Sequence, residues 1–165
     1  MRAEQSDVIT GDFWLGLDAI HNLTRDAPYK LRIELTTTEG AFYAAEYSTF
    51  SVGDEASRFL LSIGGYRLAD GAGIGDVMIQ AHNGKKFETW DNKNDPDVGY
   101  KNAASPLGGA FWYGEYTTPP DVVVPNVSPA CRACLNSSPG GVFGWFQIVG
   151  EPLMLTHSKM LLDCR

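Results

Sequence analysis

Between residues 29 and 35, apolar and charged side chains alternate strictly, and this pattern constrains the fold more than any other feature of the sequence. The apolar side chains are Tyr29, Leu31, Ile33 and Leu35, and the charged ones between them are Lys30, Arg32 and Glu34. Because successive side chains of a strand point to opposite faces, the alternation predicts a strand buried on one face. The turn signal Glu39-Gly40 follows, and aromatic and small apolar residues over 41–52 predict the return strand of a hairpin.

Patterns on either side of the hairpin predict a short helix and further strands. Apolar residues three to four apart between 17 and 23 predict a helix with Asp18 near its start. A helical turn is expected at 54–56, and a strand over 58–63 that ends at Gly64-Gly65. Further strands are expected near 77–79, near 87–89 and over the aromatic stretch 141–149.

Glycine recurs with Asp, Asn and Pro between residues 68 and 110, which predicts long ordered loops. Long loops on a rigid scaffold are typical of recognition or metal sites.

The length of 165 residues predicts one domain. The net charge of −7 argues against a nucleic-acid partner, because acidic surfaces repel phosphate. No apolar run approaches the ~18 residues of a membrane span, and the first ten residues lack the apolar core of a secretory signal.

The run from Asp91 to Gly99 has the density of oxygen ligands that a hard cation such as calcium needs. It does not match an EF-hand, and a polar surface turn is the alternative explanation. The cysteines Cys131, Cys134 and Cys164 are compatible with a disulfide and a spare thiol, with three ordinary thiols, or with a zinc site that includes His157.

An aromatic cluster at 111–113 is followed by Tyr116 and Thr117. Aromatic planes beside short polar side chains stack on sugar faces or form apolar pockets for small acyl groups. The alternative is a core strand, above all for Trp112, whereas Tyr116 and Thr117 are expected at the surface. No histidine or serine lies in a recognised catalytic frame, so the sequence predicts a protein that is not an enzyme.

Two plain sequons for N-linked glycosylation occur, Asn22-Leu-Thr and Asn136-Ser-Ser, and a third begins at Asn126. Such triplets also arise by chance, so the sequence leaves open whether they carry glycans.

Residues 11–117 resemble the fibrinogen C-terminal domain, which fibrinogen chains, ficolins, tachylectins, angiopoietins and tenascins share. The resemblance rests on ordered motifs, namely GDFWLGLDAIHNLT at 11–24, YKLRIEL at 29–35, FSVGDE at 50–55, IGGY at 63–66, HNG at 82–84 and a Phe-x-Thr-Trp-Asp run at 87–91. Similarity weakens over 118–165, although Trp145 and Met160 fit the closing strand of the family. The family domains are longer on the N-terminal side, so the chain is expected to be a single partial domain over 1–165 or a fragment of a longer secreted product.

The resemblance implies an α+β fold with an antiparallel sheet, short helices and a long-loop recognition subdomain. It also implies a calcium loop in which Asp95 supplies a carboxylate and Asp97 and Gly99 supply backbone carbonyls. Lys93 stands where the family has a second carboxylate, which removes one ligand and adds a positive charge. Asp91 or Asp97 is the candidate substitute, or the lysine itself pairs with Asp95 in place of the ion.

The binding pocket of the family is also altered in this sequence. The cysteines of its disulfide correspond to Ala103 and Tyr116, Thr117 replaces a histidine, and Leu153 replaces a pocket tyrosine. Trp112 and Tyr113 are retained. The candidate ligand-binding residues are therefore Trp112, Tyr113, Tyr116 and Thr117.

The resemblance implies non-catalytic extracellular recognition of acetylated carbohydrate in innate defence, as in ficolin-like lectins. The alternative is a protein-binding module of the receptor-ligand or matrix type with a degenerate sugar pocket. A third hypothesis, from another class, is a small hydrolase that uses His82 and the loop 91–97. The expected partners are an acetylated glycan or an extracellular protein, and a homo-oligomer would supply avidity.

Overall fold

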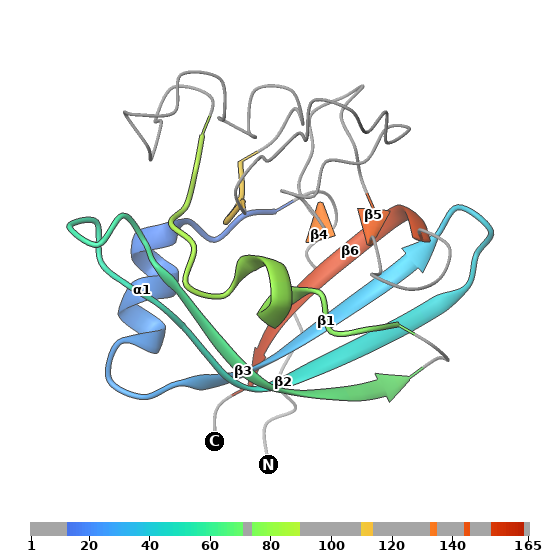
Figure 1. Cartoon of the computed structure of the whole chain (residues 1–165), viewed down its shortest axis with the longest axis horizontal. Coiled ribbons are helices and arrows are strands. Elements are labelled where there is room, and N and C mark those ends of the chain that lie inside the picture. The colour runs from blue at the N-terminus through green and yellow to red at the C-terminus, as the bar shows by residue number, and fades with distance from the viewer. Residues whose placement is uncertain are drawn as a thin grey trace, which may run out of the picture.

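An antiparallel sheet in the order β3-β2-β1-β6-β5-β4 is the framework of the molecule (Figure 1). The structure, a computed structural model, describes residues 13–70, 74–89, 110–113, 133–134, 144–145 and 153–163. The strands are β1 (Tyr29–Thr37), β2 (Phe42–Val52), β3 (Leu61–Asp70), β4 (Ala133–Cys134), β5 (Gly144–Trp145) and β6 (Leu153–Asp163). Helix α1 (Leu17–Thr24) precedes the sheet in the chain, and the π-helical turn η1 (Met78–His82) follows β3. The predicted α+β class is confirmed.

Strand β1 lies in the middle of the sheet and confirms the predicted alternation. Ile33 pairs with Ala45 of β2 on one side and with Met160 of β6 on the other. Leu31, Ile33 and Leu35 are fully buried, whereas the charged residues between them are only half-buried or exposed. The hairpin predicted from the alternation and the turn signal is therefore present, with its apolar face in the core.

The opposite face of the sheet carries a network of ion pairs around Arg32. Its guanidinium group contacts Glu34 at 2.9 Å, Glu46 at 3.0 Å and Asp70 at 2.7 Å, and Arg67 also contacts Glu46. These residues come from β1, β2 and β3. The network links three strands across the polar face, where water makes each pair individually weak.

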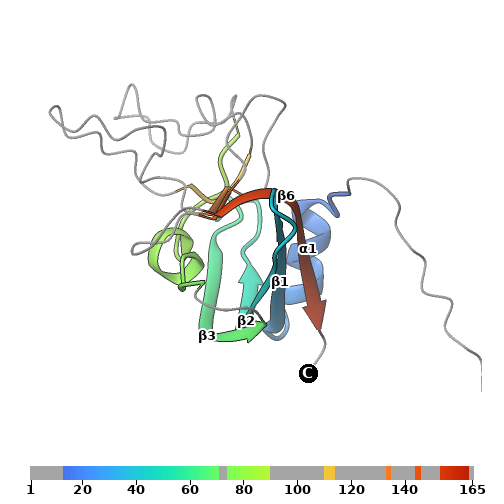
Figure 2. The ribbon, with the colours of Figure 1, turned by 90° about the vertical axis from the view of Figure 1, so that its right-hand side faces the viewer.

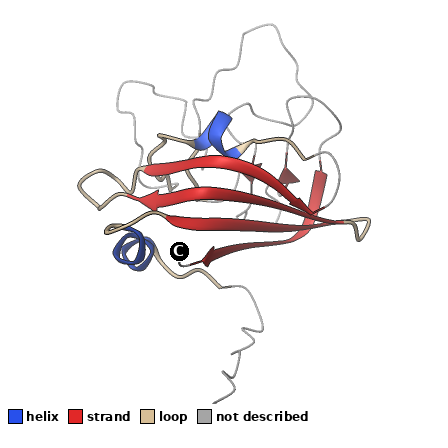
Figure 3. Cartoon of the chain, turned by 90° about the horizontal axis from the view of Figure 1, so that it is seen from below, coloured by secondary structure: helices blue, strands red, loops and turns tan. Residues whose placement is uncertain are grey.

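Helix α1 packs against β2 and η1 packs against β3, so that the two lie apart in the molecule, and both contribute buried side chains to one core (Figures 2 and 3). Helix α1 is joined to the end of β2 through Thr24, whose hydroxyl donates to the Ile20 carbonyl at 2.8 Å and accepts from Val52 N at 3.1 Å. His21 Nδ1 donates to the Val52 carbonyl at 2.9 Å. The predicted helix over 17–23 is thus confirmed, and buried hydrogen bonds set its position.

The predicted end of a strand at Gly64-Gly65 is wrong, because β3 begins at Leu61 and continues through both glycines to Asp70. A Cβ atom on Gly65 would lie 1.9 Å from Ser48 Oγ, and Gly65 has φ +67°. A Cβ atom on Gly64 would lie 3.0 Å from Thr49 Oγ1. The two glycines therefore permit close approach to β2 within the sheet instead of ending the strand.

Replacing Gly65 with alanine is expected to lower the free energy of unfolding by about 1–3 kcal/mol, because a left-handed non-glycine residue is strained. Gly40→Ala is the matched control, since Gly40 has φ +83° but a Cβ atom added to it would have no neighbour within 4 Å. Gly65→Ala should be the more destabilising of the two in urea unfolding, and adding Ser48→Gly should recover part of the difference. Equal losses at the two glycines would contradict the close-approach explanation.

The remaining predictions of secondary structure met mixed outcomes. The turn expected at 54–56 is present over residues 55–58. The strand near 77–79 is wrong, because Met78–His82 forms η1, and 87–89 contributes only an isolated bridge between Glu88 and Phe111. Of the expected strand 141–149, Gly144 and Trp145 form β5, and the other residues lie outside the described part of the chain. None of the helices in the described ranges is long and apolar enough to cross a membrane.

Candidate functional site

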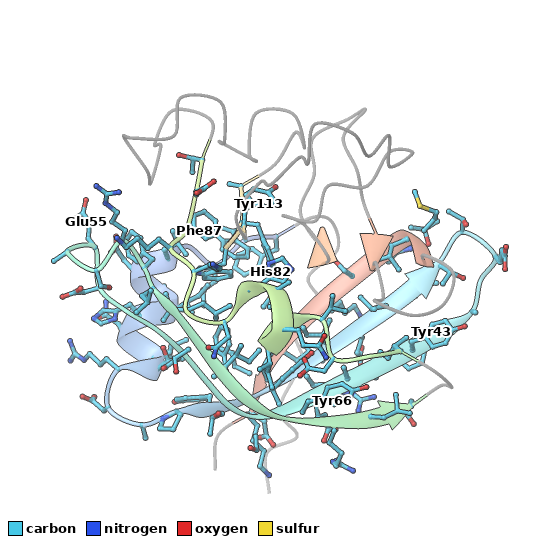
Figure 4. All side chains as sticks on the ribbon, viewed as in Figure 1. Tyr43, Glu55, Tyr66, His82, Phe87 and Tyr113 are labelled. Carbon is cyan, nitrogen blue, oxygen red and sulfur yellow. The ribbon has the colours of Figure 1, made fainter. Side chains whose placement is uncertain are left out.

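Two described segments, 87–89 and 110–113, frame the stretch of chain that contains the candidate metal ligands. Glu88 N donates to the Phe111 carbonyl at 2.9 Å, and Phe111 N donates to the Glu88 carbonyl at 3.1 Å. This antiparallel bridge brings the two ends of residues 90–109 to one place in the fold. Figure 4 shows Phe87, His82 and Tyr113 in this part of the molecule, while Tyr43 and Tyr66 lie farther along the sheet.

Trp112 lies in the core, which is a correction to its place among the ligand-binding candidates. The side chain is fully buried, and its Nε1 donates to the Phe59 carbonyl at 2.6 Å. Its ring packs edge-to-face against Phe87 at 4.9 Å and Phe111 at 5.3 Å between centroids. Trp112 therefore supports the site from beneath, because its ring is covered and no face of it is presented to a ligand.

Tyr113 is also buried, with 3% of its surface exposed. Burial, and then the negative charge of Glu88, raise the pKa of its phenol. The hydroxyl group is therefore protonated at physiological pH and is able to donate a hydrogen bond. A role for Tyr113 in ligand binding stays a prediction.

The other candidate residues lie outside the described part of the chain. They are the ligand-binding candidates Tyr116 and Thr117 and the metal candidates Asp91, Asp95, Asp97 and Gly99, together with Lys93 and the pocket position Ala103. Among the residues that the structure does describe, no group of three or more His, Cys, Asp or Glu side chains is placed to hold a metal ion.

His82 positions the segment that carries Trp112 and Tyr113. It lies at the end of η1, fully buried, with its ring edge-to-face on Phe111 at a centroid distance of 5.4 Å. Its Nδ1 lies 2.8 Å from the Trp112 carbonyl oxygen. Since a carbonyl only accepts, Nδ1 carries the hydrogen and donates it. From the sequence His82 is a candidate general base, but its contacts are those of a structural residue.

Asp76 fixes η1 at its first turn. Its Oδ1 accepts from Ile79 N at 3.0 Å and from the Tyr47 hydroxyl at 3.4 Å. The Tyr66 hydroxyl donates to the Ile74 carbonyl nearby. These bonds hold residues 74–79 against β2 and β3, and so place His82. Sequence reasoning missed this hydrogen bond, although an Asp directly before the apolar run at 77–79 is a signal for the start of a helical turn.

Burial raises the pKa of Asp76 above its ordinary value of 3.8, against the opposing effect of its hydrogen bonds. A carboxyl group whose pKa is raised in the native state contributes stability below its unfolded-state pKa and loses it as the pH rises through the folded-state value. The stability of the native chain relative to Asp76→Asn should therefore fall as the pH rises from below 3.8 towards neutral. Urea unfolding over a pH series measures this difference.

Asp54 is the matched control for this pH dependence. Hydrogen bonds from Ser57 lower its pKa, so its contribution is present above the unfolded-state pKa and is lost as the pH falls. The stability of the native chain relative to Asp54→Asn should consequently change with pH in the opposite direction. Slopes of the same sign for the two substitutions would contradict the assignment for Asp76.

The chain is similar to fibrinogen-related proteins in both sequence and structure. The family model described as fibrinogen beta and gamma chains, C-terminal globular domain, matches residues 3–119. Fibrinogen-like protein A of Apostichopus parvimensis is 40% identical over 103 residues, which are 62% of this chain and 35% of that protein. Tenascin of Mus musculus is 39% identical over 102 residues, 62% of this chain and 4% of that protein. The chain thus spans only a minor part of the curated relatives it matches.

The fold is similar to solved fibrinogen-like globe domains. That of human ANGPTL2 superposes with a TM-score of 0.70 at 26% sequence identity. The superposition covers 93% of this chain and 66% of the other. The similarity in fold therefore extends well beyond the residues that match in sequence.

Proposed function

Because the family model matches most of its length, the chain belongs to the family of fibrinogen C-terminal globular domains, and we propose that it is a non-catalytic extracellular recognition module. The observation that carries the proposal is the bridge between Glu88 and Phe111. It joins the two described segments on either side of residues 90–109, which the sequence predicts to form loops, at a buried aromatic cluster. Rigid scaffolds that present long loops are typical of binding proteins. An extracellular location follows the same family membership.

The geometry of His82 supports a non-catalytic function. A general base must reach the proton that it removes from a substrate. His82 is fully buried and its Nδ1–H is committed to the Trp112 carbonyl. The hydrolase hypothesis required this histidine, so the recognition module is favoured over it.

A protein is the ligand class that we favour over an acetylated sugar. Sugar recognition uses an exposed aromatic face, and Trp112 and Tyr113 are both buried. An acetyl-binding pocket would therefore depend on Tyr116 and Thr117, where the sequence departs from the family pattern. The ficolin-like lectin remains the second candidate, because Trp112 and Tyr113 of the family pocket are retained in this sequence.

Competition with free N-acetylglucosamine distinguishes the two ligand classes. Fluorescently labelled chain is expected to bind intact animal cells, to lose binding when the cells are first treated with trypsin, and to keep it in excess N-acetylglucosamine. Tyr116→Ala should weaken this binding, whereas Leu161→Ala, on the exposed face of β6, should leave it unchanged. Retention on N-acetylglucosamine beads, with release by the free sugar, would favour the lectin. Absence of binding to both cells and beads would overturn recognition altogether.

Residues 91–99 contain several side chains whose oxygen atoms are suited to bind calcium. Three carboxylates, at Asp91, Asp95 and Asp97, suit calcium, but the ammonium of Lys93 opposes a cation. We therefore propose that Lys93 weakens calcium binding at a loop that otherwise provides oxygen ligands.

Lys93→Asp is expected to increase the rise in melting temperature that millimolar calcium produces, relative to chelator. Calcium at 100 times its Kd adds about 2.7 kcal/mol, which corresponds to several degrees in a domain of this size. Lys86→Asp makes the same change of charge at an exposed position before the loop and should leave the calcium effect unaltered. A calcium-induced shift that is equal in the native chain and in Lys93→Asp would contradict the role given to Lys93.

A further inference from the structure

The first sequon lies on the outer face of helix α1. Ile20 and Thr24 form the buried side of the helix, and Asp18, Asn22 and Arg25 are exposed. The Asn22 side chain accepts a hydrogen bond from Arg25 Nη1 at 3.2 Å through its Oδ1. The contact uses Oδ1 and not Nδ2, which is the atom that carries an N-linked glycan. It therefore does not prevent modification of Nδ2.

The fold explains Thr24 but gives no comparable reason for Asn22. The Thr24 hydroxyl joins α1 to β2 through two buried hydrogen bonds, so a threonine is needed there whether or not a glycan is present. Asparagine, by contrast, is a poor helix former, and at an exposed helical position alanine, lysine or glutamate would favour the helix more. The single exposed contact with Arg25 is a weak compensation.

We propose that Asn22 is a site of N-linked glycosylation. In the reaction, Asn22 Nδ2 forms a bond to the anomeric carbon of an oligosaccharide carried on a lipid diphosphate. The bond from that carbon to the diphosphate oxygen breaks, Nδ2 loses one proton, and the lipid diphosphate leaves. Oδ1 is unchanged, so the hydrogen bond from Arg25 is retained in the product.

The burial of Thr24 sets the order of events. The glycosylating enzyme recognises the hydroxyl group of the sequon together with its asparagine. In the folded chain, Thr24 is 1% exposed and its hydroxyl is occupied on both sides. Transfer of the glycan therefore precedes the docking of α1 onto β2.

A glycan on this face is compatible with recognition by the rest of the molecule. Figure 2 shows α1 well apart from η1, whose His82 holds the segment 110–113. The outer face of α1 also includes Leu23, an apolar side chain that is 46% exposed. A hydrophilic glycan on the neighbouring residue shields this apolar surface from water.

Peptide mass spectrometry tests the site without interference from the other sequons. The full chain, preceded by a secretory leader, is expressed in a eukaryotic cell line, and both the medium and the membrane-enclosed fraction are digested with trypsin. Cleavage after Arg2 and Arg25 gives a peptide of residues 3–25, in which Asn22 is the only asparagine. We expect this peptide to carry N-acetylhexosamine and hexose, and enzymatic release of the glycan to convert Asn22 to aspartate.

Asn22→Gln is the test variant, because it removes the acceptor at an exposed position and leaves Thr24 in place. It should abolish the glycan on residues 3–25 and leave binding to cells unchanged. An unmodified 3–25 peptide from native chain that has entered the secretory lumen would overturn the site. The proposal rests on the extracellular location given above, but the two fail differently: secretion without sugar on Asn22 overturns only the glycan, and loss of cell binding overturns only recognition.

Discussion

Trp112→Ala is expected to lower the free energy of unfolding by about 3–5 kcal/mol, because the substitution empties a site that is fully buried. The indole contacts Phe87 and Phe111, and its Nε1 donates to Phe59, so the loss affects three segments together. Equilibrium unfolding in urea measures the effect. The midpoint of the unfolding transition should move to a clearly lower urea concentration at room temperature.

Trp14→Ala is the matched control for this substitution. Trp14 is 42% exposed and stacks on Phe87 at a centroid distance of 6.0 Å, so it shares a neighbour with Trp112 but not its burial. Its removal should cost at most about 2 kcal/mol. Trp112→Phe keeps a ring but leaves the Phe59 carbonyl without the indole donor, which predicts an intermediate loss of about 1–3 kcal/mol. If Trp112→Ala cost no more than Trp14→Ala, Trp112 would not be the core residue described above.

The hairpin and α1 were predictable because their signals are local. The alternation at 29–35 depends only on which side chains face the core, and the turn at Glu39-Gly40 connects strands that are neighbours in sequence. Helix α1 likewise carries its apolar spacing within eight residues. In each case the pattern and the tertiary contacts favour the same structure.

The residue pattern did not predict β6, because a bulge hides its alternation, and only the family resemblance indicated a closing strand that includes Met160. Leu155 pairs with Thr37, but His157 pairs with Thr36, so one additional residue lies in β6 between them. The buried side therefore changes from odd to even positions, and Met160 and Leu162 face the core after it. Its partner is also remote in the sequence, since Lys30 pairs with Asp163. A period of two cannot be recognised across such a shift.

The sequence predicted which residues lie near the candidate site, but not whether their side chains face the core or a ligand. The aromatic run at 111–113 is equally suited to a core or to a binding surface, and local sequence does not distinguish them. The choice depends on Phe59 and His82, which are remote in sequence and which contact Trp112 through its indole and its carbonyl. At 78–82 the local hydrogen bond from Ile79 N to Asp76 favours η1 over a strand, and the remote Tyr47 hydroxyl, which donates to the same carboxylate, supports it.

His82→Ala is expected to lower the free energy of unfolding by about 2–4 kcal/mol and to loosen the bridge between Glu88 and Phe111. The substitution leaves the buried Trp112 carbonyl without its donor and removes a ring that packs on Phe111. Because Phe111 also forms the bridge with Glu88, the loss should be transmitted to the segment 87–89 as well as to 110–113. Hydrogen exchange at the Glu88 and Phe111 amides, compared with Ile33 in the central strand, measures this local opening.

Two further histidine variants separate positioning from general destabilisation. His157→Ala changes an exposed histidine of β6 and should alter stability by no more than about 0.5 kcal/mol. His82→Asn supplies an amide N–H close to the position of Nδ1, so it should restore part of the protection at Glu88 and Phe111 even where the lost ring still lowers global stability. If the exchange rates at Glu88, Phe111 and Ile33 rose equally in His82→Ala, His82 would stabilise the whole fold without a specific effect on the loop. Selective exchange at the bridge, reversed by asparagine, would instead establish that one buried hydrogen bond from η1 fixes the bridge between segments 87–89 and 110–113.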